Sequence, residues 1–557
     1  MNRLSFVVVL AAGFVSVAVP AVAKPKAPPA LDAAMNVLME ELDSVNAVNA
    51  AHTKEISDLK QHIADMDALL KKATEETRTL VAVEVEASRK ALAAAESRLT
   101  TLESRQVYNG RKLPWLVPML EVRLRPMYDK NRTDTDTGRG DSDLYYLQRI
   151  RLGLTVTPWK GVQGVLVLQD SREWGEEKST TSNQHSLDLY QGYLLFDDIA
   201  GSGAWIQAGR FAMKYGANRQ VSVKDFNNVG QAFDGVRIGW RRARVMAADA
   251  FVTFYRNGFA PVFQPQGQDR YSVFAGMYLS TDAVSWLDAE LYGFYQDNGF
   301  VTQRESIGTI GARLVARPVK GLTLEGEAAV QVGRVTVRDE SAVLRDASHL
   351  ATAYFLQAKY TAPIKTDPWI GLFFYSASGD ANPWDGSSVA YRPLFPSGKG
   401  NMGNMELFRW QGVWDIGPTV GLYPAANVRL SFDYHVYSMT TDGGNLQGFD
   451  AQMARASDPY PSALVNRTFN VPAGGSRFLG QEMDVELTWK PVDVLALGLG
   501  YSFFKAGAAA LRGQVLSVGE RTATVDGSEV TTPYWKRDYR MGNDMAHRVW
   551  IEATLSL

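Results

Sequence analysis

A period-two alternation of apolar and polar residues, repeated from residue 118 to residue 557, is the feature that most constrains how this chain can fold. Each repeat has about 9–13 alternating residues and ends in turn residues. In residues 428–436, apolar side chains at every second position oppose Arg429, Asp433 and His435. Because successive side chains of a strand point to opposite faces, each strand has one apolar face and one polar face. A soluble sandwich would turn the polar face to water outside, whereas a membrane barrel turns it to the lumen.

The lengths of the connections favour the barrel. Short connections follow the even-numbered strands, at residues 158–161, 317–321, 363–365 and 490–493. Long connections follow odd-numbered strands, at about 214–231, 379–404, 440–476 and 506–543. Outer-membrane barrels show this asymmetry, with tight periplasmic turns and long external loops. The sequence therefore predicts an all-β transmembrane barrel of about 18 antiparallel strands over residues 118–557.

The last strand agrees with this prediction. In Val549–Leu557, apolar residues occupy every second position up to the carboxyl terminus. This pattern resembles the C-terminal assembly signal of outer-membrane proteins, although the chain ends in Leu557 rather than Phe. We therefore expect the protein to be located in the cell outer membrane, in contact with its lipid.

Shorter segments precede the predicted barrel. Residues 1–23 contain one basic residue, Arg3, then an apolar run and the small-residue pattern Ala21-Val22-Ala23, which indicate a cleaved signal peptide. Residues 24–30 form a short Pro-rich linker, and residues 106–117 form a second linker. We expect the mature protein to be exported.

Residues 31–105 predict a long α-helical coiled coil in the periplasm. Apolar residues recur there in steps of three and four, and the segment contains no Gly, Pro or aromatic residue. Such an apolar stripe would stay exposed to water on a lone helix, so we expect the chain to form a homo-oligomer through this segment. The residue types in the stripe leave a dimer and a trimer both open. A rod of this kind could also reach a periplasmic partner or peptidoglycan.

Missing residues and motifs exclude several classes of function. The chain has no Cys, which excludes disulfides, thiolate metal sites and cysteine nucleophiles. None of its six His lies four residues from another, and no P-loop, Rossmann fingerprint or G-x-S-x-G motif occurs. The 58 basic residues do not exceed the 60 acidic ones, which argues against nucleic-acid binding. We expect no enzymatic activity, no catalytic residue, no metal and no cofactor.

The alternation also assigns charged side chains to the lumen. The residues that we expect there include Arg123, Arg125, Arg149, Arg151, Arg210, Arg237, Arg313, Glu325, Glu327 and Asp484. Arginine dominates the first strands, whereas carboxylates dominate the middle and last strands. A series of guanidinium groups would favour the passage of anions. The alternative is that arginine–carboxylate pairs between strands hold the wall together.

A set of short motifs, in this order, resembles the alginate-export family of outer-membrane porins. The motifs include Gln148–Leu154, Gln169–Gly175, Asp188–Tyr193, Gly209-Arg210-Phe211, Ala232–Arg237, Gly379–Gly386, Asp433-Tyr434-His435 and Gly480–Asp484. The resemblance implies an eighteen-stranded barrel with an arginine-lined, electropositive constriction that passes a polyuronate. The positions that match the family are Arg149, Arg151, Arg210, Arg219, Asp234 and Arg237. A long N-terminal coiled coil departs from the usual family pattern.

Two functions follow from these observations. The first is passive transport, in which an arginine-rich outer-membrane channel passes anionic solutes or exports an acidic polysaccharide such as alginate. The second is structural, in which the barrel anchors a coiled coil that tethers the envelope. The arginines of the first strands favour the channel, and the uninterrupted rod favours the tether.

Overall fold

The computed structural model describes residues 115–132, 142–176, 187–242, 245–255, 272–298, 305–383, 385–446, 467–525, 528–540 and 542–557. The structure does not describe residues 1–114. The predicted signal peptide, the linker at 24–30, the predicted coiled coil and residues 106–114 of the second linker therefore lie outside the described residues. The self-association and the periplasmic or peptidoglycan contact expected of the coiled coil therefore stay predictions. Among the described residues, no helix has the length and apolar character needed to cross a membrane.

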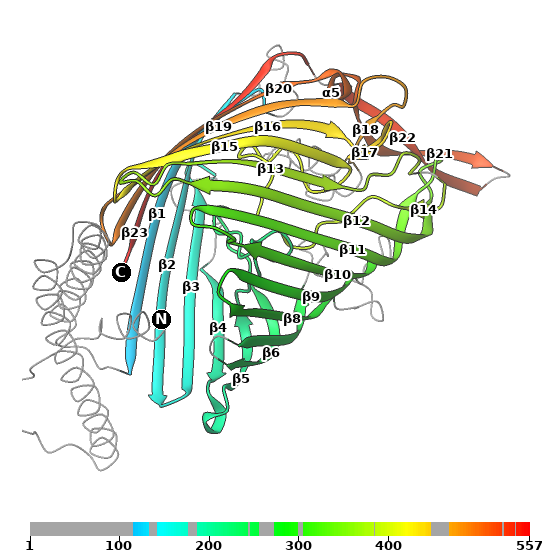
Figure 1. Ribbon diagram of the computed structural model, residues 1–557. Helices are drawn as coiled ribbons and strands as arrows, with labels where there is room; N and C mark the ends of the chain where they lie inside the picture. Colours follow the sequence, from blue (N-terminus) through cyan, green and yellow to red (C-terminus); the bar gives the residue numbers. More distant parts are fainter. Residues whose placement is uncertain are drawn as a thin grey trace, which may run out of the picture. The chain divides into compact units, whose positions relative to one another are not determined.

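Eighteen antiparallel strands form one closed barrel, which confirms the predicted fold and strand number (Figure 1). The first and last strands pair with each other, with Glu121 opposite Ser556, so the ring has no free edge. The strands are β1 (Leu116–Lys130), β2 (Asp143–Trp159), β3 (Val162–Glu173), β4 (Asp188–Phe196), β5 (Ala204–Phe211), β6 (Phe233–Arg242), β7 (Met246–Tyr255), β8 (Ser272–Val284), β9 (Leu287–Asn298), β10 (Glu305–Ala316), β11 (Leu322–Arg338), β12 (Leu344–Thr361), β13 (Trp369–Ala377), β15 (Val413–Ala425), β16 (Val428–Met439), β19 (Phe478–Val492), β20 (Leu495–Ala506) and β23 (Met545–Ser556).

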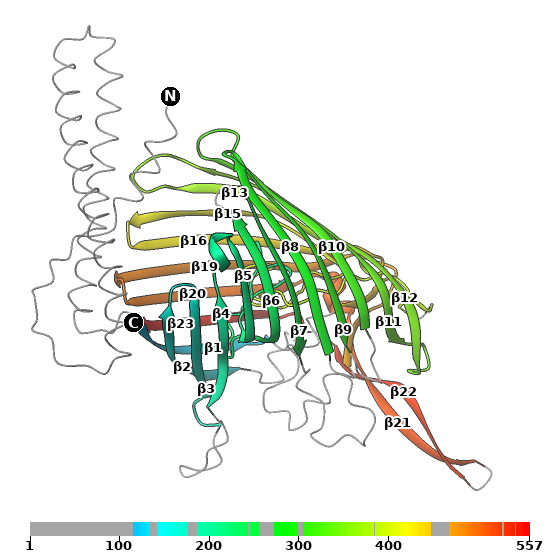
Figure 2. The same cartoon turned by 90° about the horizontal axis from the view of Figure 1, so that it is seen from below.

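The longest connections all lie at one end of the barrel, as the sequence predicts, although the connections on either side of β12, residues 339–343 and 362–368, are both short. Two residues join β15 to β16 and two join β19 to β20, whereas β13 is followed by the long stretch 378–412 before β15 begins. The connections after β16 and β20 carry a second, four-stranded sheet of β17 (Gly444–Leu446), β18 (Arg467–Val471), β21 (Gln514–Val525) and β22 (Ser528–Arg540). The β21–β22 hairpin extends past the ends of the barrel strands (Figure 2). All of these additions lie at one end of the barrel.

The outer face of the barrel is apolar and the inner face is polar. On the outer face, Ile310 is 65% exposed, Ile370 60% and Leu356 59%. Their neighbours along the chain point inward, and Thr309 is fully buried. A closed ring leaves no unpaired strand edge, and an apolar exterior matches the hydrocarbon of a bilayer.

Two connections fold into the lumen and pair with each other there. The first inward segment, residues 212–232, joins β5 to β6, and the second inward segment, residues 378–412, joins β13 to β15. The Ser222 amide donates to the Phe395 carbonyl at 2.9 Å, and the Phe395 amide donates to the Gln220 carbonyl at 2.8 Å. A short strand of the second segment, β14 (Ser387–Ser388), also runs parallel to β12. The lumen is therefore partly filled by the chain's own backbone.

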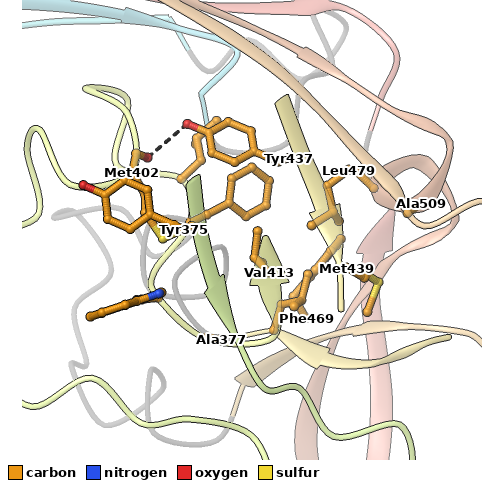
Figure 3. Close-up of a cluster of buried hydrophobic side chains, with 14 of the residues drawn as sticks. Tyr375, Ala377, Met402, Val413, Tyr437, Met439, Phe469, Leu479 and Ala509 are labelled. Carbon is orange, nitrogen blue, oxygen red and sulfur yellow. Dashed lines mark hydrogen bonds between the residues drawn. The ribbon is translucent and has the colours of Figure 1, made fainter. Parts of the chain in front are cut away.

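A buried apolar cluster fastens the second inward segment to the wall (Figure 3). Met402 of that segment packs near Tyr375 of β13 and Tyr437 of β16, and the Tyr437 hydroxyl donates to the Met402 carbonyl at 3.0 Å. Leu479 of β19 and Phe469 of β18 extend the same cluster. The polar lumen thus contains an apolar core. Burial of these apolar side chains stabilises the position of the second inward segment against the wall.

The exposed outer face leads to a prediction. Replacing Ile310, at the middle of β10, with Arg should lower the free energy of unfolding in lipid vesicles by about 2–4 kcal/mol, because a charge at the bilayer midplane is poorly solvated. Denaturant titration of vesicle-embedded protein measures this change. Ile310→Leu serves as the control and should unfold like the wild type. An arginine variant as stable as that control would show that this face is not in contact with hydrocarbon.

Candidate functional site

Three arginines of the first two strands bind the backbone of the first inward segment. Arg123 donates to the Asp225 carbonyl at 2.5 Å and to the Asn227 carbonyl at 2.7 Å. Arg149 donates to the same two carbonyls at 2.8 and 3.1 Å. Arg125 donates to the carbonyl between them, that of Phe226, at 2.5 Å. All three guanidinium groups are buried, so they hold the segment against the β1–β2 wall.

The Asp225 side chain completes this contact. Its carboxylate accepts hydrogen bonds from Arg149 at 2.8 Å and from Arg151 at 3.2 Å, and Glu121 of β1 pairs with Arg149 at 2.7 Å. Burial would raise the pKa of Asp225, but Arg149, Arg151 and Arg123 outweigh burial and hold that pKa below its ordinary value. The Arg151 guanidinium also lies over the Tyr190 ring, 4.0 Å from its centroid. We call this cluster of arginines and segment backbone the arginine latch.

A second cluster anchors the same segment to the opposite part of the wall. Arg219 of the first inward segment pairs with Glu325 at 2.7 Å and with Glu327 at 2.9 Å, both on β11. Arg313 of β10 shares Glu325 at 2.9 Å and also binds Glu290 at 2.8 Å. Four of the predicted pore residues therefore meet in one network.

The remaining predicted residues lie in separate pairs. Arg210 of β5 binds Asp234 of β6 at 2.8 Å in a partly exposed pair. Arg237 of β6 forms an ion pair with Asp249 of β7 and lies over the Trp205 ring, 5.0 Å from its centroid. These pairs join neighbouring strands within the wall.

Asp484 of β19 belongs to a buried polar cluster that holds the second inward segment. It accepts a hydrogen bond from the Asn404 amide at 3.0 Å, and neighbouring Glu482 accepts one from the Met405 amide at 2.8 Å. His435 lies between Asp484, 3.6 Å away, and Asp415, 2.8 Å away. Carboxylates on β19 thus bind amides of the second segment, while arginines on β1 and β2 bind carbonyls of the first.

A cavity of about 130 Å³ lies between the two inward segments. Its charged lining residues are Arg219, Lys224, Arg409 and Glu406. Glu325 and Glu327 of β11 neutralise the charge of Arg219. Glu406 pairs with Arg548 of β23 at 3.0 Å. Within the described part of the chain, Lys224 and Arg409 form no ion pair, so they supply the positive charge of this narrow region.

Strand alternation could not identify Lys224 and Arg409, because both lie in connections between strands. Their only sequence signal is that they occur in two long connections of the predicted barrel. Burial, followed by repulsion from Arg409, lowers the pKa of Lys224 to about 8, while Glu406 acts in the opposite direction. The Lys224 ammonium is therefore charged at neutral pH and loses its charge in mildly alkaline solution.

Comparison with known proteins assigns the chain to a family. The family profile described as alginate export matches residues 115–524. The chain belongs to the alginate export family. This confirms the resemblance inferred from the motifs of the sequence.

The barrel is also similar to solved structures from Pseudomonas aeruginosa. OccK8 (OprE) has 12% identity and a TM-score of 0.47, with 79% of this chain and 98% of that chain covered. The outer membrane protein OprD has 12% identity and a TM-score of 0.43, with 79% of this chain and 94% of that chain covered. OpdK, solved with vanillate, has 13% identity and a TM-score of 0.43, with 79% of this chain and 98% of that chain covered. No curated protein matches the sequence.

The arginine latch leads to a second prediction. Arg149→Met should lower the free energy of unfolding by about 1–3 kcal/mol, because it removes the buried guanidinium that binds the Asp225 and Asn227 carbonyls and leaves the Glu121 and Asp225 carboxylates with Arg151 alone. Arg210→Met is the matched control, since its pair with Asp234 is partly exposed and should contribute only about 0–1 kcal/mol.

Denaturant titration measures both variants, and limited proteolysis reports on the inward segment. Residues 212–232 should become cleavable in Arg149→Met and stay protected in Arg210→Met. Equal destabilisation of the two variants, with the segment still protected in both, would contradict the role given to the latch.

Proposed function

We propose that this protein is an outer-membrane channel for anionic solutes or for export of an acidic polysaccharide, with Lys224 and Arg409 as its selective cations. The observation that supports this proposal most directly is the small cavity between the inward segments, where these two cations form no ion pair among the described residues. Membership of the alginate export family supports the same class of solute. An unpaired cation in a narrow, protein-lined passage attracts anions more strongly than a paired one.

The paired arginines have a different part in this proposal. Arg149 and Arg219 hold the first inward segment from two sides and thereby place Lys224 in the passage. Pairing neutralises them, so that they do not hold a passing anion too tightly. Selectivity therefore depends on the inward segments, and the wall arginines contribute by fixing the position of one of them.

Transport in this proposal is passive and involves no catalysis. The sequence has no nucleotide-binding motif, so the energy for directional export would come from elsewhere. A solute would diffuse through the lumen along weak, successive contacts.

A third prediction tests the selectivity. In a planar bilayer with a KCl gradient, the wild-type channel should show an anion-selective reversal potential and concentration-dependent block by an oligouronate. A unit charge at about 8 Å in water changes an ion's energy by about 0.5 kcal/mol, with opposite sign for an anion and a cation, so Lys224→Gln should lower the anion-to-cation permeability ratio about sixfold. The double variant with Arg409→Gln should lower the ratio about thirtyfold.

The control is Lys365→Gln, which removes an exposed charge from the short connection between β12 and β13. It should leave the reversal potential unchanged. If the double variant is as anion-selective as this control, the selective charge is elsewhere and the proposed role of Lys224 and Arg409 is wrong.

A fourth prediction concerns pH. Because the pKa of Lys224 is about 8, the anion preference of the wild-type channel should fall as the pH rises from 7 to 9. Lys224→Arg keeps its charge over this range and should abolish the decline. Reversal potentials recorded at both pH values measure the effect, and a decline of equal size in Lys224→Arg would attribute it to another group.

A further inference from the structure

A second, larger cavity lies on the other side of the second inward segment. Its volume is about 450 Å³, which is in the usual range for small-molecule sites. It is lined by β12, β13, β15, β16 and β19, which run side by side (Figure 1), and by residues 399–401 and Asn404 of the inward segment. Trp369 and Arg429 lie next to short connections, so the cavity is at the short-connection end of the lumen. Tyr375 and Asn401 line both cavities, so the two cavities adjoin each other.

An aromatic surface forms one side of this cavity. Trp369, Phe373 and Tyr375 alternate along the inner face of β13. Trp369 lies against Gly421 of β15, where an added Cβ would come within 2.2 Å of the indole ring. The absence of a side chain at Gly421 therefore lets the indole lie against the wall. A large aromatic side chain held in this way presents a rigid apolar surface to a ligand.

Two cations border this surface. The Arg429 guanidinium is 5.3 Å from the centroid of the Trp369 ring, and Lys359 of β12 lines the same cavity. Neither forms an ion pair within the described ranges, whereas nearby Lys399 is neutralised by Glu486 at 2.8 Å. Asp433, Thr419 and Asn401 add hydrogen-bonding groups to the lining.

We propose that this larger cavity binds a sugar unit of an acidic saccharide, with the sugar ring on Trp369 and its carboxylate on Arg429. The apolar C–H face of a sugar ring fits an aromatic surface, and a guanidinium binds a carboxylate with two parallel hydrogen bonds. The Asp433 carboxylate and the Asn401 side-chain carbonyl then accept hydrogen bonds from ring hydroxyls. The proposal rests on the proposed function for the class of solute, but the site is separate from Lys224 and Arg409.

The composition of the cavity favours this ligand over simpler ones. An inorganic anion would use Arg429 and Lys359 but gain nothing from the indole surface. A neutral sugar would use the indole but give neither cation an ion pair. An apolar ligand would leave the buried polar lining without hydrogen bonds. Only a ligand with a ring, hydroxyls and a carboxylate engages all three kinds of group.

Calorimetric titration of the full-length, detergent-solubilised protein tests the proposal. The probes are a uronic-acid trisaccharide, a neutral trisaccharide of the same linkage, and acetate. The wild type should bind the uronate trisaccharide most tightly. Trp369→Ala should weaken that binding about tenfold, and Arg429→Gln should weaken it to a similar extent while leaving the weaker binding of the neutral trisaccharide unchanged.

Two controls make the result specific. Trp159→Ala removes an indole that is 72% exposed near a short connection and should bind like the wild type. The unfolding midpoints of all variants should match, which separates loss of binding from loss of structure. If Trp369→Ala and Arg429→Gln bind the uronate as tightly as the wild type, the site is not there. If the neutral trisaccharide or acetate binds as tightly as the uronate, the assignment to acidic saccharides is wrong.

The Lys224→Gln, Arg409→Gln double variant separates this proposal from the proposed function. It should lose anion selectivity in the bilayer and still bind the uronate trisaccharide in solution. If the wild-type channel is anion-selective but neither Trp369→Ala nor Arg429→Gln changes uronate binding, the proposed site is wrong and the proposed function stands. Tight uronate binding that depends on Trp369 and Arg429, in a channel with no anion selectivity, would overturn the proposed function alone.

Discussion

The pairing of β1 with β23 is the contact on which the rest of the structure depends. It closes the ring, so that every barrel strand has a hydrogen-bonded neighbour on both sides and an apolar exterior can face lipid. Closure also creates an inside that is separated from the lipid. Charged side chains at alternate strand positions are then directed into one shared space, where they can meet groups far away in the sequence. Arg125 of β1 and Glu552 of β23, for example, are paired at 2.5 Å.

Most of the lumen charge stabilises the inserted segments and the wall. Arginines on β1 and β2 bind carbonyls of the first inward segment, and carboxylates on β19 bind amides of the second. A buried backbone group outside regular secondary structure needs a hydrogen-bond partner other than the backbone of a neighbouring strand. Charged side chains make the strongest hydrogen bonds of this kind. The charges expected to act on a solute are those that form no ion pair, and among the described residues these include Lys224, Arg409 and Arg429.

The sequence was most informative where a simple period controls the structure. Strand alternation predicted the barrel, and the lengths of connections such as 378–412 predicted which ends carry the additions. The resemblance to the alginate export family came from short motifs in a shared order, and the family profile confirms it. The path of the long connections was not predictable. A segment such as 212–232 has no period of its own, and its position depends on partners on β1, β2 and β11.

The sequence by itself determined the alternation of strand faces, the number of strands and the presence of arginine in the first strands, because these depend on residues next to each other in the chain. Only the tertiary structure decided which charges are neutralised. Arg149 of β2 and Lys224 of the first inward segment are both basic residues in the first half of the barrel sequence. One is buried against Asp225 and Glu121, and the other lines a cavity without an ion pair among the described residues. Their difference arises from contacts between distant segments, which exist only after the ring has closed and the two connections have folded into it.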